Sequence, residues 1–182
     1  MRKARYEIDM TRGPLFGKLI SFSVPLMLTG ILQLLYNAAD MVVVGKYGSD
    51  TSLAAVGSTG SLINLIVNVL MGMSVGAGVV VANAIGAGNR EKASRATHTS
   101  IFISVVFGIV VGIFGVFMAR PLLEMMKSPE DVIELSSLYV KIYFAGLPVT
   151  MLYNFGASIL RATGDTKRPL YFLIASGLVN VV

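Results

Sequence analysis

LISFSVPLMLTGILQLLYNAADMVVVG, residues 19–45, decides the fold. These 27 residues contain one charged side chain, Asp40. A membrane-spanning helix needs about 20 consecutive apolar residues, so the stretch predicts a transmembrane helix. A carboxylate inside such a helix costs several kcal/mol, and it usually faces the protein interior and serves a function. Asp40 is therefore the first candidate for a functional residue.

A polar stripe accompanies this carboxylate. Gln33, Tyr36, Asn37 and Asp40 are spaced i, i+3, i+4 and i+7, which places them on one helical face. A buried carboxylate with oxygen-bearing neighbours can exchange a proton for Na⁺, so the stripe favours a coupling-ion site. The alternative is that Asp40 only caps the outer end of the helix or pairs with a loop.

Four further uncharged or nearly uncharged runs predict more spans. The protein is 54% hydrophobic and 14% charged, and its mean hydropathy is +0.74. We expect an all-α membrane protein, a polytopic helical bundle of about five spans. The spans are predicted near residues 15–44, 53–83, 95–118, 131–160 and 168–182. The last run contains only about 14 apolar residues, too few to cross a membrane. We therefore expect the chain to be a fragment, an incomplete N-terminal transmembrane lobe.

The basic residues predict the orientation. Eleven Lys and Arg residues fall on the side of the N-terminus, and four fall on the other side or its span ends. Loops rich in Lys and Arg stay in the cytoplasm, so we expect a cytoplasmic N-terminus. The same placement explains the net charge of +5 without nucleic acid, which we do not expect as a partner.

Catalysis and metal binding are not expected. Asp40 is the only acid well inside a predicted span, and His98 is the only histidine. The sequence contains no cysteine and no cluster of metal ligands. We expect no catalytic residue, no metal site and no cofactor other than a coupling ion. The protein is therefore not expected to be an enzyme.

Other residues inside the spans admit two interpretations. Asn64 and Asn68 are spaced i, i+4, as are Asn154 and Ser158, and intramembrane asparagines either join helices or line a cavity. Two Gly-x-x-x-Gly pairs, at 72–76 and 108–112, favour close helix packing over a sliding surface. Pro25 predicts a kink in the first span, because proline removes a backbone donor and clashes with the preceding turn.

Six segments together resemble the multidrug and toxic compound extrusion (MATE) family. They read MTRGP at 10–14, QLLYNAAD at 33–40, SLAAVG at 52–57, GMSVGAG at 72–78, GAGN at 86–89 and LRATGDTKRP at 160–169. They cover the chain in the order that the family has, so the resemblance is specific.

The resemblance implies twelve spans in two six-helix lobes, of which this chain would be most of the first. Asp40 matches the acid that binds H⁺ or Na⁺, with Gln33 and Tyr36 beside it. Pro25 matches a proline at which the first helix can bend. Asn180 matches the asparagine of an Asn-x-x-x-acid pattern, whose acid would follow two residues beyond Val182.

From these observations we expect a cation-coupled antiporter that exports amphipathic or cationic drugs and toxic compounds by alternating access. The expected coupling residues are Asp40, Asn180, Tyr36 and Asn37. The expected substrate-cavity residues are Gln33, Asn64, Asn68 and Asn154. The expected partners are drug-like small molecules, the lipid bilayer and the C-terminal lobe of the same polypeptide, in a bacterial plasma membrane. The alternatives are a flippase of lipid-linked precursors from the same wider superfamily and a non-transporting membrane fragment.

Overall fold

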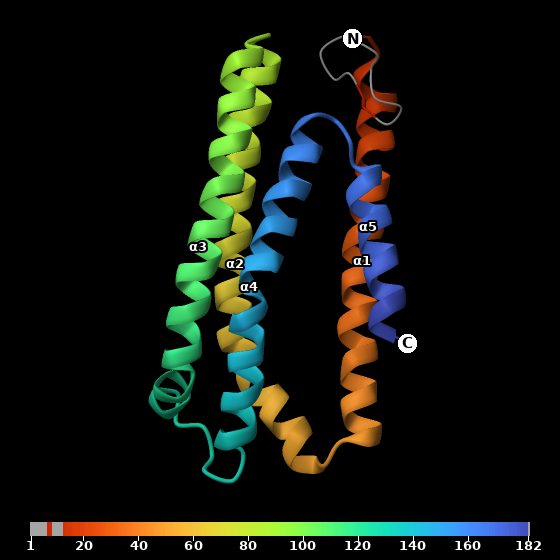
Figure 1. Ribbon diagram of the computed structural model, residues 1–182. Coiled ribbons are helices and arrows are strands. Elements are labelled where there is room, and N and C mark those ends of the chain that lie inside the picture. Colours follow the sequence, from red (N-terminus) through yellow and green to blue (C-terminus); the bar gives the residue numbers. More distant parts are fainter. Residues whose placement is uncertain (1–6, 9–12, 182) are drawn as a thin grey trace.

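A computed structural model describes residues 7–8 and 13–181, and the side chains of residues 50, 180 and 181 lie outside this description. Every described element is a helix (Figure 1). The helices are α1 (Leu15–Tyr47), α2 (Asp50–Gly86), α3 (Arg90–Met125), α4 (Ile133–Ala162) and α5 (Lys167–Val181). By length and composition, α1 to α4 can each cross a membrane. The expected all-helical membrane fold is confirmed.

The first four helices are longer than a bilayer requires. α1 has 33 residues and α3 has 36, which correspond to about 50 Å and 54 Å at 1.5 Å per residue. A hydrocarbon core is about 30 Å thick, so their ends reach into the headgroup region and beyond it. Hydropathy alone marks the apolar middle of each helix, which explains why the helices extend past most of the predicted span ends.

Short polar caps end one helix and start the next. The backbone N–H of Gly48 closes α1 on the Val44 carbonyl at 2.9 Å, and Ser49 caps α2 by accepting from Ser52 N–H. Gly88 turns the chain with φ +71°, and Asn89 then caps α3 by accepting from Lys92 N–H at 2.9 Å. The segment GAGN therefore ends α2 and begins α3.

Helices α2, α3 and α4 form one tightly packed unit, seen on the left of Figure 1. Its core contains Phe144, Leu147 and Met151 of α4, all buried. Small residues of α3 face them at helical spacing. A Cβ added at Gly108 would lie 2.8 Å from the Cα of Pro148, and one at Gly112 would lie 2.8 Å from the Phe144 carbonyl oxygen. The second predicted glycine pair is thus a site of close helix packing.

The first predicted glycine pair behaves differently. A Cβ added at Gly72 or at Gly76 would meet nothing within 4 Å. α2 instead approaches α4 at Gly78, where a Cβ would overlap the Ser158 hydroxyl. The residue spacing of both pairs is the same, so only the packing of the bundle tells them apart.

Helix α1 lies apart from the α2–α3–α4 unit and packs mainly on α5. Both helices run in the same direction along the molecule (Figure 1). Pro25 is the only buried residue of α1 within the described chain. α1 and α5 therefore form a second, thinner unit beside the first.

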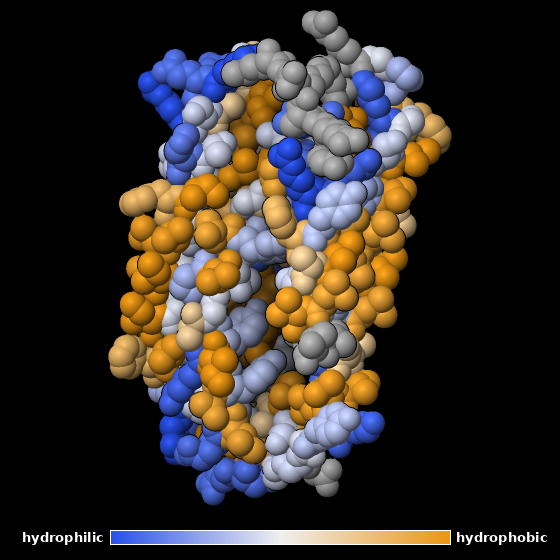
Figure 2. All heavy atoms as spheres, turned by 45° about the vertical axis from the view of Figure 1, so that its right-hand side comes forward, coloured by the Kyte–Doolittle hydropathy of each residue, from blue (hydrophilic) through white to orange (hydrophobic). Residues whose placement is uncertain are grey.

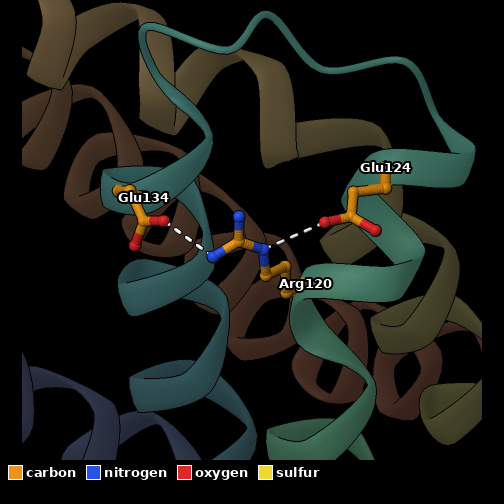
Figure 3. Close-up of polar contacts among 3 residues, drawn as sticks. All are labelled: Arg120, Glu124 and Glu134. Carbon is orange, nitrogen blue, oxygen red and sulfur yellow. Dashed lines mark hydrogen bonds and ion pairs between the residues drawn. The ribbon is translucent and has the colours of Figure 1, made fainter.

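The end of the α2–α3–α4 unit at the α3–α4 connection carries an exposed cluster of charges (Figure 3). Arg120 Nε lies 2.9 Å from Glu124 Oε1, and Arg120 Nη1 lies 2.7 Å from Glu134 Oε1. The residues from Arg120 to Met125 belong to α3. On the face that Figure 2 shows, hydrophilic residues gather at both ends of the molecule and hydrophobic ones predominate between them. This banding fits a protein that spans a bilayer.

Candidate functional site

The candidate site starts where Tyr36 of α1 meets α5. The Tyr36 hydroxyl donates a hydrogen bond to the Leu173 carbonyl oxygen at 3.2 Å. One turn along α5, a Cβ on Gly177 would overlap the Tyr36 ring. Tyr36 is half-buried by this contact, whereas most of α1 is exposed. The predicted polar stripe therefore touches α5 through its tyrosine.

Asp40 lies one helical turn beyond Tyr36 on the same face of α1. Its carboxylate acts electrostatically on the hydroxyl of Tyr139, on α4. The side chain of Asp40 is exposed, so the described helices leave it accessible. A proton or a small cation can reach it there.

The remaining residues of the stripe differ in exposure. Gln33 is half-buried and Asn37 is exposed, and both lie within one turn of Tyr36 on α1. Asn180 follows Gly177 by three residues on α5, but its side chain lies outside the described part of the chain. Its predicted role therefore remains a prediction.

The asparagines predicted for a substrate cavity bond within their own helices. Asn68 donates to the Asn64 carbonyl at 2.8 Å, and Asn154 donates to the Thr150 carbonyl at 2.9 Å. Among the described side chains, no hydrogen bond joins these three asparagines to Tyr36 or to another helix. These bonds do not join one helix to another. The interpretation that the asparagines line a substrate cavity remains a prediction.

α1 continues through Pro25 as one helix. The Thr29 hydroxyl donates to the Pro25 carbonyl at 2.8 Å. A proline removes one backbone hydrogen bond, and a threonine that bonds back to residue i−4 tends to bend a helix. Both features weaken the same turn of α1, so a bend is easiest there.

The loop between α4 and α5 carries charged residues, and one of them, Asp165, stabilises the start of α5. Gly164 adopts φ +89°, and the Ile8 N–H donates to its carbonyl at 3.2 Å. Asp165 is fully buried and accepts from the backbone N–H groups of Lys167 and Arg168, each at 3.1 Å. Its second oxygen lies 3.1 Å from Arg168 Nε. Asp165 is therefore the N-cap of α5, held in place by an ion pair.

Three parts of this arrangement were outside the predicted site. They are Tyr139, the Leu173 carbonyl and Gly177. A backbone carbonyl leaves no sequence signal, and Tyr139 is far from Asp40 in the sequence. Gly177 does carry a signal, because Ala175, Ser176 and Gly177 form a run of small residues in an apolar helix. Such a run marks a place where another helix can approach closely.

Comparison with known proteins covers nearly the whole chain. The sequence pattern of the family described as MatE matches residues 25–182. The chain is 32% identical over 160 residues to the protein named Probable multidrug resistance protein YoeA, from Bacillus subtilis. That match covers 88% of this chain and 35% of the relative. The chain spans 34–39% of the length of the first curated relatives it matches.

Solved structures give the same result. A transporter of the MOP superfamily from Pyrococcus furiosus matches with a TM-score of 0.89 and 27% sequence identity. The match covers 99% of this chain and 40% of that one. A crystal structure described as MATE in the straight conformation matches with a TM-score of 0.88 and 28% identity, over 98% of this chain and 40% of that one. The arrangement of α1 to α5 is therefore one that known transporters share.

Proposed function

The chain belongs to the MatE family, and we propose that it forms part of a cation-coupled antiporter that exports drug-like small molecules. Curated relatives are named multidrug resistance or multidrug export proteins. In this proposal the helices described above form the N-terminal lobe. A second lobe of the same polypeptide completes the transport path across the plasma membrane.

The observation that carries the proposal is the position of Asp40. Its carboxylate is the only one that lies well inside a predicted span, and its side chain is exposed among the described helices. A proton and Na⁺ compete for one carboxylate, which is the property that a coupling site needs. Tyr36 and Asn37 place further oxygen atoms within one turn of it. In this proposal the ion binds at Asp40 and drives the change between outward-open and inward-open states.

The substrate path runs along the polar residues that face away from the packed core. In the proposal, Gln33, Asn64, Asn68 and Asn154 contribute side-chain amides to a cavity for amphipathic cations. Asn64 and Asn68 lie on an exposed face of α2. The rival function, a flippase of lipid-linked precursors, needs cationic side chains to hold a pyrophosphate. The interiors of the first three predicted spans contain no Lys or Arg, which favours the drug exporter.

The test uses the full-length protein in cells that lack their own drug exporters. Asp40→Asn keeps the shape of the side chain and removes its ability to bind a proton or balance a cation. We expect it to abolish ethidium efflux and drug resistance at unchanged protein level. Asp131→Asn, in the exposed α3–α4 loop, is the matched control and should transport normally. Unchanged efflux by Asp40→Asn would refute the proposal.

A further inference from the structure

Gly177 is the residue of α5 that lets Tyr36 reach the helix backbone. A Cβ at this position would overlap the Cζ, Cε1 and hydroxyl oxygen of Tyr36. In an α-helix the carbonyl of Leu173 accepts the N–H of Gly177, four residues later. The Tyr36 hydroxyl donates to this same carbonyl, to which the Ser176 hydroxyl also donates at 3.1 Å. The missing side chain of Gly177 thus opens a notch on α5, and the end of the Tyr36 ring fills it.

This contact controls how α1 sits on α5. α1 has few other anchors, because Pro25 is its only buried residue within the described chain. A tyrosine ring seated in a notch limits both the distance between the two helices and the rotation of α1 about its own axis. Tyr36 and Asp40 are one turn apart on one face. The rotation that seats Tyr36 on α5 therefore also sets the direction in which the Asp40 side chain leaves α1.

We infer that Gly177 is a positioning residue of the Asp40 site: by admitting the Tyr36 ring, it fixes the distance and rotation of α1 on α5 and so the place of the carboxylate. The inference rests on the proposed function, since it assigns a role in ion coupling. α1 and α5 run in the same direction (Figure 1). One turn beyond the notch, Asp40 on α1 and the backbone of Asn180 on α5 therefore come to the same level.

Gly177→Ala gives a clear test, because its two effects oppose each other. Alanine generally stabilises a helix, whereas here the added Cβ would clash with Tyr36. Alanine has a higher helix propensity than glycine, so Gly177→Ala should be harmless unless the notch matters. Gly156→Ala on α4 is the matched control, because a Cβ there would meet nothing within 4 Å. Tyr36→Leu removes the three atoms that a Cβ at position 177 would overlap.

The measurement is the concentration of coupling ion, H⁺ or Na⁺, at half-maximal ethidium efflux by the full-length protein in proteoliposomes. We expect Gly177→Ala to shift this concentration by at least about tenfold, because misplacing a site group by about an ångström has an effect of this order or larger. Gly156→Ala should not shift it. In the Tyr36→Leu background, adding Gly177→Ala should produce no further shift, because the overlap is gone.

Three results would overturn the inference. They are a Gly177→Ala protein that matches Gly156→Ala, a shift of equal size in both Tyr36 backgrounds, and a double variant that does not accumulate although Tyr36→Leu does. If Gly177→Ala alone fails to accumulate, recovery in the double variant supports the notch. Asp40→Asn in the same assay separates the two proposals. Retained efflux there contradicts the proposed function, whereas lost efflux with an unshifted Gly177→Ala contradicts only the role of Gly177.

Discussion

The packing of α3 on α4 predicts the outcome of one small substitution, Gly112→Ala. The added Cβ would lie 2.8 Å from the Phe144 carbonyl oxygen. This neighbour is backbone, so it cannot rotate away as a side chain can. Gly156→Ala on α4 adds the same methyl group where nothing lies within 4 Å. Both variants replace a glycine inside a helix by alanine, and they differ only in what surrounds the added methyl group.

The structure gives the size of the effect. Ordinary contact begins at 3.4 Å, so α3 and α4 must separate by about 0.6 Å at this turn, in a core packed to crystal density. Overpacking of this kind costs about 1–3 kcal/mol. Both variants gain up to about 1 kcal/mol from the better helix propensity of alanine. That gain cancels in the comparison. Gly112→Ala should therefore be less stable than Gly156→Ala by about 1–3 kcal/mol.

Thermal unfolding of the purified full-length protein in detergent measures this difference. The Gly112→Ala protein should lose its monodisperse elution peak at a lower temperature than the Gly156→Ala protein. Equal melting temperatures, or a higher one for Gly112→Ala, would refute the close approach of α3 and α4 that the structure describes.

Three further substitutions test other parts of the fold. Asp165→Ala should lower stability by about 1–2 kcal/mol, because α5 loses its N-cap; Asp165→Asn keeps an oxygen acceptor and should cost less, and equal losses would contradict the cap. Arg120→Ala should leave the melting temperature unchanged, because its ion pairs are exposed and exposed pairs contribute little; a clear drop would mean that the cluster holds the α3–α4 connection together. Pro25→Ala should accumulate normally and transport ethidium more slowly, since it removes the weak turn at which α1 can bend; efflux at the normal rate would exclude a bend there.

The all-helical membrane fold could be predicted from hydropathy, because a bilayer demands long apolar runs. The polar stripe of α1 could also be predicted, since helical spacing alone places Asp40 and Tyr36 on one face. Which helix faces pack against one another could not be predicted from the sequence. The pairs Gly72–Gly76 and Gly108–Gly112 have the same spacing, and only the second is pressed against another helix. Which pair finds a partner depends on the tertiary arrangement.

The residues of other helices around Asp40 could not be predicted from the sequence either. Tyr36 bonds to the Leu173 carbonyl, 137 residues away in the chain. Every residue has a backbone carbonyl, so no sequence pattern could identify the carbonyl of Leu173 as the acceptor. Tyr139, on which the charge of Asp40 acts, lies on another helix and far from Asp40 in the sequence. Residues that share a helix face could thus be found from the sequence, and residues that meet across helices could not.

In the proposed mechanism Asp40 binds the ion that drives export. This role can be measured as ion release on addition of ethidium to the purified full-length protein, recorded with a pH or Na⁺ indicator. We expect the unmodified protein and Asp131→Asn to release ions in proportion to the ethidium bound, and Asp40→Asn to release none while still binding ethidium. Equal release by Asp40→Asn would show that the coupling ion does not bind at Asp40.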